Sequence, residues 1–455
     1  MVAVSLVVLL AACGLAPAPS VTSDEHGLHP APAASFAPDD HTSSMTLLAN
    51  VPKYRHSADF YHSDLAFWGD LAVQGSYDGF RIIDISQPDA PRLVADVECR
   101  GPQGDVSIWQ DLVVMSVDRP QTAPGCDSAD ATADDAGRLG RRGGWEGLRV
   151  FDIGRPASPR LVASVRTDCG SHTHTVVPDP RRDRLLVYVS SYAIIQDSTT
   201  APECLNPHGH ISVISIPLDA PGEARVVSQP TLVDTPEWEP FAGAPPSFHP
   251  TTGCHDISVF LPLRLAAAAC MSEGQIWDIS DPVHPRTLAH VDVPDIVFWH
   301  SAAWSNDGSL VAFGDENLEP IGCSNDRQGA IWFYRVAHPA KPSLAGRFGL
   351  PRIQGQEICS AHMFNVVPGI ERDLLVSAFY AGCTSVIDFS DPANPREVAY
   401  YDINGLSPGD EWSAYWYRGH VYASDHWRGL DVFEVTLPEL AGASDLPHLD
   451  PQLQE

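Results

Sequence analysis

The chain has 455 residues, and its 28 basic and 58 acidic side chains give a formal net charge of −30 at pH 7. A surface this acidic repels the phosphates of nucleic acids and of anionic lipids, whose binding requires clustered Lys and Arg. The 40 prolines and 34 glycines are spread along the chain, which favours many short strands joined by turns.

The N-terminal residues have the pattern of an export signal. Residues 2–12 are apolar but shorter than the roughly 20 residues that span a bilayer. They lead into the motif LAAC, which ends at Cys13 and resembles the lipobox of bacterial lipoproteins. This resemblance implies removal of a signal peptide, residues 1–12, and lipidation of Cys13; an ordinary secretory signal is the alternative. We therefore expect an exported chain, attached to a bacterial membrane through its lipid alone, in the periplasm or at the cell surface. Residues 13–44 are predicted to be a flexible tether.

One segment recurs along the chain. It is GFRIIDISQPDAPRLVADV at Gly79, and it predicts a strand, a turn bounded by prolines and a second strand. Two further strands are predicted before it, in HSDLAFWGDLAVQGS from His62, and before each other copy. Close copies begin at Gly147, Gly274 and Thr384, and weaker copies at Gly209, Gly329 and Gly429. Seven units of four strands predict an all-β fold, a seven-bladed β-propeller with the first strand of each antiparallel blade innermost.

The two ends of the repeat region complement each other. Residues 46–51, TLLANV, match the second half of the repeat without a first half, whereas Gly429–Leu437 has the first half alone. We therefore expect the N-terminal strand to complete the last blade and to close the ring, which leaves no exposed sheet edge. Because a closed ring needs no partner to cover an edge, a monomer is expected.

The propeller is predicted to span residues 45–438, with 439–455 as a C-terminal tail. Two segments between predicted strands are long. The acidic, Ala- and Gly-rich segment 118–145 is expected to be disordered. The segment 231–253, which contains several aromatic residues, is expected to cover one face of the ring.

The repeated pattern resembles a known family. Written G-x-x-Φ-Φ-D-I-S-x-P-x-x-P-x-Φ-V-A-x-V, with Φ apolar, it is similar to the LVIVD repeat of exported or surface-attached bacterial and archaeal proteins, which are held to be β-propellers. The resemblance implies the fold but no reaction. The aspartates that recur in the turn are expected to bond to nearby backbone and fix the link between the third and fourth strands, rather than to bind a ligand. They are Asp84, Asp152, Asp278 and Asp388.

Besides Cys13 there are nine cysteines, whose positions follow the blade pattern. Four lie just before an innermost strand and four just after the adjoining second strand. Antiparallel pairing brings these ends together, within the distance that a disulfide requires, and an exported protein meets oxidising conditions. The predicted pairs are Cys99–Cys126, Cys169–Cys204, Cys254–Cys270 and Cys359–Cys383. Cys323 is left over and competes with Cys383 for Cys359.

The starts of the inner strands carry polar residues that converge at one mouth of the predicted channel. The candidate binding residues are Asp64, Asp105, His174, Asp256, Trp412, Glu316, Asp425 and His426; the candidate metal ligands are His62, His172, His255, His300 and His362. Imidazoles with carboxylates suit Zn²⁺, Cu²⁺, Fe²⁺ or Mn²⁺, and an open site could activate water or bind oxygen. A structural Ca²⁺ on the acidic rim is a further alternative. Against a metal, a wet channel needs polar lining of some kind, and no HExxH motif, paired CxxC motifs or G-x-S-x-G elbow occurs.

Two functions remain open from the sequence. The first is a membrane-anchored scaffold that binds a protein, a glycan or a small molecule at the channel mouth, with no catalytic residues. The second is a metal-dependent periplasmic oxidoreductase or hydrolase that uses the ring of His and Asp side chains. Seven-bladed propellers similar to the selenium-binding, methanethiol-oxidising group hold metals through channel histidines, but this is an analogy of fold alone.

Overall fold

The computed structural model describes residues 37–53, 60–140, 143–179, 181–191, 200–204, 209–232, 253–271, 273–291, 296, 298–317, 329–352, 358 and 360–455. In these residues almost all regular structure is β-strand. The helical turns are η2 (Ala133–Asp135), α1 (Ala136–Leu139), η4 (Pro202–Cys204), η5 (Pro221–Glu223) and η6 (Pro438–Leu440). None of the helices in this part of the chain has the length and apolar character needed to cross a membrane.

The strands pair in chain order into antiparallel units of four, which we number sheets 1 to 7. Sheet 1 is β3 (His62–Trp68), β4 (Leu71–Ser76), β5 (Gly79–Asp84) and β6 (Arg92–Glu98); sheet 2 is β7 (Val106–Trp109), β8 (Leu112–Gln121), β9 (Trp145–Asp152) and β10 (Arg160–Arg166). Sheet 3 is β11 (Thr173–Asp179), β12 (Arg184–Ser190), β13 (Ser212–Pro217) and β14 (Arg225–Ser228); sheet 4 is β15 (Asp256–Phe260), β16 (Leu265–Cys270), β17 (Glu273–Asp278) and β18 (Arg286–Val291).

Sheet 5 is β19 (Trp299–Trp304), β20 (Leu310–Asp315), β21 (Ile331–Arg335) and β22 (Ser343–Phe348); sheet 6 is β23 (Met363–Val366), β24 (Leu374–Ala378), β25 (Thr384–Asp388) and β26 (Arg396–Asp402). Sheet 7 is β27 (Glu411–Tyr417), β28 (His420–Asp425), β29 (Gly429–Val435) and β2 (Met45–Val51). Parallel pairing of β23 with β27 joins sheets 6 and 7.

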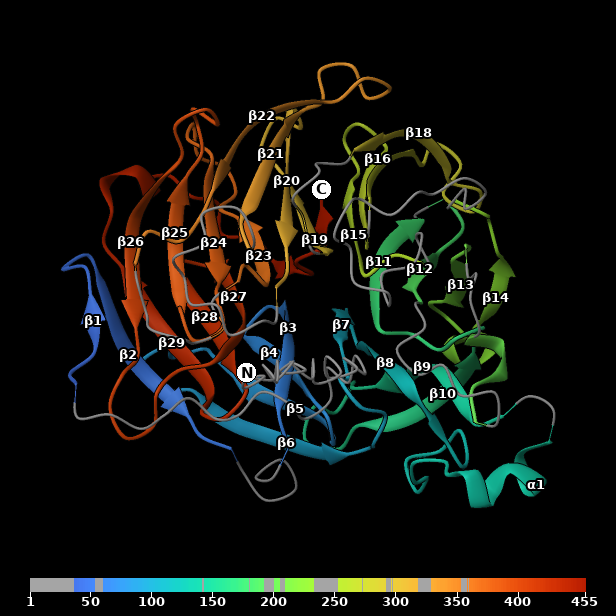
Figure 1. Ribbon diagram of the computed structural model, residues 1–455. Helices are drawn as coiled ribbons and strands as arrows, with labels where there is room; N and C mark the ends of the chain where they lie inside the picture. Colours follow the sequence, from blue (N-terminus) through green and yellow to red (C-terminus); the bar gives the residue numbers. More distant parts are fainter. Residues whose placement is uncertain are drawn as a thin grey trace, which may run out of the picture.

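The first strands of successive sheets lie beside one another, and β27 also contacts β3. Figure 1 shows these first strands around a common centre, with the fourth strands on the outside. The described part of the chain is therefore an all-β protein of several small antiparallel sheets, consistent with propeller blades.

The N-terminal strand lies where the sequence predicts it. In β2, Met45 is opposite Val435 and Val51 is opposite Leu430 on β29. The predicted tether, by contrast, ends earlier than residue 44. The short strand β1 (Asp40–His41) pairs with β26, and Asp39 accepts hydrogen bonds from the Tyr401 hydroxyl and the Asn404 backbone amide.

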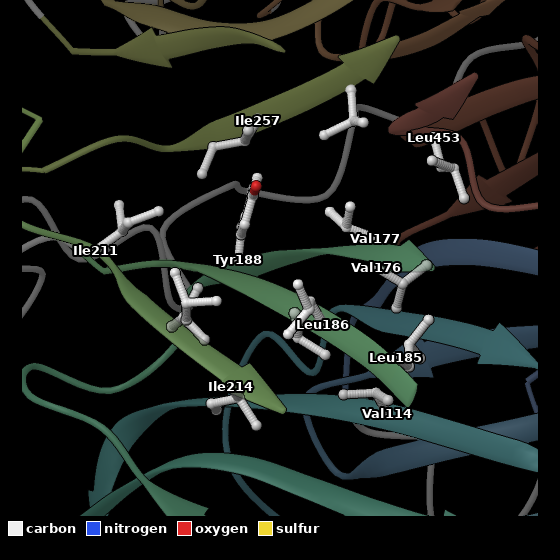
Figure 2. Packing of buried hydrophobic residues seen from close by; sticks show 14 of the residues in the cluster. Val114, Val176, Val177, Leu185, Leu186, Tyr188, Ile211, Ile214, Ile257 and Leu453 are labelled. Carbon is white, nitrogen blue, oxygen red and sulfur yellow. The ribbon is translucent and has the colours of Figure 1, made fainter. Parts of the chain in front are cut away.

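The inner strands are buried because the sheets pack face to face, whereas the fourth strands are partly exposed. Figure 2 shows one such interface, in which aliphatic side chains of sheets 2, 3 and 4 meet. Val114 of β8, Leu186 of β12 and Ile257 of β15 are fully or almost fully buried there. Burial on both faces explains why the first three strands of each unit are so rich in apolar residues.

The recurring aspartates act as turn locks, as the sequence predicts. Each aspartate accepts a hydrogen bond from the backbone amide two residues later and forms an ion pair with the arginine eight residues later. The sets are Asp84 with Ser86 and Arg92, Asp152 with Gly154 and Arg160, Asp278 with Ser280 and Arg286, and Asp388 with Ser390 and Arg396. The repeat residues are thus structural and lie away from the first strands.

Three disulfides join the pairs Cys99–Cys126, Cys169–Cys204 and Cys254–Cys270, which are three of the four predicted pairs. Cys383 is buried and forms no disulfide with another described residue, and burial raises the pKa of its thiol well above the usual value. Its predicted partner Cys359, like Cys323, lies outside the described residues, so that pairing stays a prediction. Cys13 and most of the segment 231–253 also lie outside them.

The expectation that 118–145 is disordered is wrong for the described residues of that segment. It extends β8, forms η2 and α1, and is fixed at Cys126 by a disulfide. The buried guanidinium of Arg149 donates hydrogen bonds to the carbonyl oxygens of Pro124 and Gly125 and to the Ser128 hydroxyl. These contacts supply the order that the local composition does not suggest.

The C-terminal tail, residues 439–455, is built into the fold. Its strand β30 (His448–Leu449) pairs with Phe67 and Trp68 at the end of β3, and β31 (Leu453–Gln454) pairs in parallel with Val259 and Phe260 at the end of β15. Both contacts lie at the C-terminal ends of β3 and β15, whereas His62 and His255 lie at the N-terminal ends of these strands. The tail therefore crosses between sheets 1 and 4 at the far end of the inner strands.

Candidate metal centre

The predicted site residues lie in two layers along the inner strands. The layer at the strand starts contains the buried histidines His62, His172, His255, His300 and His362, joined by His426 from the end of β28. One or two residues further along lie Asp64, Asp105, His174 and Asp256, which are equally buried. Successive residues of a strand rise by about 3.3 Å, so the two layers are neighbours but not one site.

Most of the mouth histidines have the same hydrogen-bond arrangement. Nδ1 of His172 contacts Asp118 Oδ2 at 2.7 Å, Nδ1 of His255 donates to the His300 carbonyl at 3.0 Å, and Nδ1 of His362 donates to the Trp412 carbonyl. A neutral imidazole carries one N–H, so these contacts leave the lone pair on Nε2. A carboxylate or carbonyl that holds the far nitrogen in this way is typical of histidines that bind metals.

Three side chains come close enough to hold one ion. His300, Glu316 and His362 are buried, and their ligand atoms lie within 4.8 Å of one another. One Glu316 oxygen is 3.6 Å from Nε2 of His300 and the other is 3.6 Å from Nε2 of His362. Among the described residues, neither ring nitrogen of His300 forms a hydrogen bond. The Tyr380 hydroxyl donates to Glu316 and so fixes the carboxylate.

Burial favours the neutral form of His300 and His172, which is the form that binds a metal. It lowers the pKa of His300 well below the usual value, and the neighbouring His255, His362 and His172 lower it further. Burial also lowers the pKa of His172 to about 3, against the opposing effect of Asp105. Two imidazoles and a carboxylate form a donor set that Zn²⁺, Fe²⁺ and Mn²⁺ use with open coordination positions.

A second pair of imidazoles lies beside this group. Nε2 of His172 and Nε2 of His255 are 2.8 Å apart, and the Gln103 amide nitrogen is 2.9 Å from the same atom of His172. The rings of His255 and His300 have centroids 3.6 Å apart. Sheets 3 to 6 thus contribute one histidine each, and the rings of these four residues lie side by side in the order His172, His255, His300 and His362.

The remaining mouth residues have other roles. His62 contacts the Gly75 carbonyl, and His426 contacts Asp410 and lies beside the Trp412 ring. The carboxylate of Asp425 accepts hydrogen bonds from the backbone amides of Asp410, Trp427 and Arg428, so it stabilises the local backbone.

The inner layer is a buried group of carboxylates. Asp64 accepts hydrogen bonds from the Tyr415 hydroxyl and from Gln452 of the C-terminal segment, and Asp105 pairs with Nδ1 of His174 at 2.9 Å. Burial and the charge of Asp105 raise the pKa values of Asp64 and Asp256 well above normal. None of these residues belongs to the group of His300, Glu316 and His362, whose ligand atoms lie within 4.8 Å of one another.

Several residues of the site were not found from the sequence. Tyr380 follows a second strand, the position that identified Glu316, and that position could have identified it. Asp118 lies in the last part of the second strand β8, beyond the end that the sequence predicts. Gln103 precedes an inner strand but belongs to a residue type that carries little information about metal sites. Nothing in the sequence of the C-terminal segment indicates that Asp450 and Gln452 reach the inner layer.

The fold and the site define an all-β repeat protein with a buried histidine–glutamate group at the starts of its inner strands. The family described as the LVIVD repeat matches residues 66–98 and 143–167. These residues form most of sheet 1 and the third and fourth strands of sheet 2, so the chain carries LVIVD repeats there. No curated protein matches the chain. Among solved structures, it is similar to a functionally unknown protein from Desulfotomaculum acetoxidans, with 13% identity and a TM-score of 0.49 over 81% of this chain and 92% of that chain.

Proposed function

We propose that this protein binds a divalent transition-metal ion through His300, His362 and Glu316. The observation that carries the proposal is the convergence of these three buried ligands, which come from sheets 5 and 6. Three protein ligands leave coordination positions for water or a substrate, and such a metal polarises or activates what it binds. The proposal favours the metal-dependent alternative over a scaffold without metal; the protein, glycan or small-molecule ligand of the scaffold hypothesis stays a prediction.

This chain's own residues would prepare the centre. The Trp412 carbonyl holds Nδ1 of His362, which turns Nε2 toward Glu316. The Tyr380 hydroxyl holds one Glu316 oxygen and limits its rotation. Because all three ligands are buried, water reaches the ion only at the positions that the protein leaves open.

Metal content tests the proposal. The purified chain is stripped with a chelator and dialysed separately against Zn²⁺, Cu²⁺, Mn²⁺ and, without oxygen, Fe²⁺, and bound metal per chain is measured by mass spectrometry. We expect at least one equivalent of one of these metals, and the loss of one equivalent in His300→Gln. The control is His284→Gln, which changes an exposed histidine. A wild-type chain that binds only traces of all four metals would disprove the proposal.

We further infer that the sheets form a closed, seven-bladed propeller. The contact of β27 with β3 supports this, as does the pairing of β2 with β29, since together they connect the first and last units. A closed ring tolerates loss of the connecting strand poorly. Deletion of residues 37–53 is therefore expected to make the rest of the chain susceptible to proteolysis, and a deletion that leaves it resistant would argue against closure.

We also propose export and lipid attachment at Cys13. Three disulfides favour an oxidising compartment outside the cytoplasm. The test is fractionation: Cys13→Ala should move from the membrane fraction to the soluble exported fraction. If the variant stays in the membrane like the parent, the lipid anchor is wrong.

A further inference from the structure

The pair His172–His255 has an electrostatic conflict that a cation would remove. His172 is held at Nδ1 by the Asp118 carboxylate, and His255 is held at Nδ1 by the His300 carbonyl. Both acceptors require a hydrogen on Nδ1, so each neutral ring presents a lone pair at Nε2. These two nitrogens lie 2.8 Å apart. Two lone pairs at this distance repel each other unless a proton or a metal ion lies between the rings.

A third donor lies at the same place. The Gln103 side chain is fully buried, and its amide group is 2.9 Å from Nε2 of His172. Its oxygen Oε1 forms no hydrogen bond with the described residues. The nitrogen and oxygen of an amide are exchanged by a half-turn, so the same side chain can present Oε1 to a cation instead. The backbone of Gln103 is left-handed, with φ of 55°, a conformation that non-glycine residues adopt at a cost.

This group is distinct from the one in the proposed function. The ligand atoms that lie within 4.8 Å of one another belong to His300, Glu316 and His362. His172, His255 and Gln103 come from the neighbouring sheets 2 to 4 and the segment before β7. The two groups are adjacent, because the His255 ring lies against the His300 ring and donates to its carbonyl.

We propose that His172, His255 and Gln103 form a second metal position beside the first, so that the mouth holds a pair of ions. The inference rests on the proposed function, because it assigns the first ion to His300, Glu316 and His362. Two imidazoles and an amide oxygen, without a carboxylate in direct contact, favour a borderline cation such as Zn²⁺ or Cu²⁺ over Ca²⁺ or Mg²⁺. Asp118 is a positioning residue that keeps His172 in the ligating tautomer. Two neighbouring ions would together bind a substrate through two of its oxygen atoms.

Zinc stoichiometry of the full chain tests this inference. The stripped protein is titrated with Zn²⁺, and zinc per chain is measured after removal of the free ion. Wild type should hold two ions, and His172→Asn and His362→Asn should each hold one. Asparagine keeps an N–H donor near the position of Nδ1, for Asp118 in the first variant and for the Trp412 carbonyl in the second, which limits misfolding, and it has no atom at the position of Nε2. The matched control is His62→Asn, a buried mouth histidine outside both groups, which should hold two.

The outcomes separate the two proposals. If wild type binds a single ion that His362→Asn abolishes, the second position is wrong and the proposed function stands. If wild type binds no zinc and none of the other metals, both fail. A variant is compared with wild type only if its circular dichroism spectrum and melting transition match those of wild type. A Gln103→Leu variant, which removes only the amide, provides a second measurement. It should weaken zinc binding at the second position at least tenfold.

Discussion

Asp450 is a buried acid in the C-terminal segment, and its replacement by Asn should make the protein less sensitive to pH. Burial, reinforced by the charge of Asp105, raises the pKa of Asp450 to about 7 from an ordinary value of 3.8. The nearby Ser107 and His174 oppose this shift only in part. Folded Asp450 therefore keeps its proton over a range of pH in which the unfolded chain has released it.

The sign and size of the effect follow from this difference. Between pH 4 and pH 7 the folded state binds more protons at Asp450 than the unfolded state, so the free energy of unfolding falls as pH rises. Each unit of pKa difference corresponds to about 1.4 kcal/mol, so the group costs about 4 kcal/mol above pH 7 and about 3 kcal/mol more at pH 8 than at pH 5. Asp450→Asn has no proton to release and avoids this cost.

The assay is urea denaturation of wild type and variant at pH 5 and pH 8. We expect Asp450→Asn to be more stable than wild type at pH 8 by about 3 kcal/mol beyond any difference at pH 5. The other buried acids titrate in both proteins, so their contribution largely cancels in the comparison. Asp445→Asn, at an exposed position of the same segment, should show little change at either pH. If Asp450→Asn shifts stability equally at both pH values, burial does not hold the proton.

Three further predictions concern the frame and the centre. Met45→Ala should destabilise the fold by about 2–5 kcal/mol in urea denaturation, because this fully buried side chain fixes β2 to β29; a cost below about 0.5 kcal/mol would argue against a structural role for β2. Replacing Cys254 and Cys270 by serine should cost about 3 kcal/mol, as expected for a disulfide that closes a short loop, and an unchanged urea midpoint would contradict this. Tyr380→Phe should weaken metal binding 10- to 100-fold by removing the hydrogen bond to Glu316, and unchanged affinity in a competitive chelator titration would contradict that role.

The fold could be predicted from the sequence because its repeat encodes local geometry. The Asp-Ile-Ser turn, as at Asp84, is fixed by a bond to the backbone two residues later, so its position marks the link between two strands wherever it recurs. The C-terminal segment has no such repeat. Its strands are formed by pairing with β3 and β15, and only the three-dimensional arrangement shows where they go.

The metal centre could be predicted only as a set of candidates. Glu316 and Asp425 are both predicted near the end of a second strand, but Glu316 follows β20 whereas Asp425 is the last residue of β28. Glu316 lies close to two histidines, and Asp425 accepts hydrogen bonds from backbone amides. This difference depends on the local backbone path and on which neighbours fill the space. Sequence position gives the end of the inner strands at which a side chain lies but not which carboxylate approaches an imidazole to ligating distance.

The arrangement also changes how the predicted ring of histidines is understood. A ring around the axis would draw equally on all inner strands, but His300, Glu316 and His362 come from two adjacent sheets. The metal would therefore lie to one side, against sheets 5 and 6, with the His172–His255 pair next to it. On the other flank of the group, in sheet 7, His426 lies beside the rings of Tyr380 and Trp412. Repeats that build identical frames can thus support an asymmetric site, because the strand starts that precede each repeat vary independently of it.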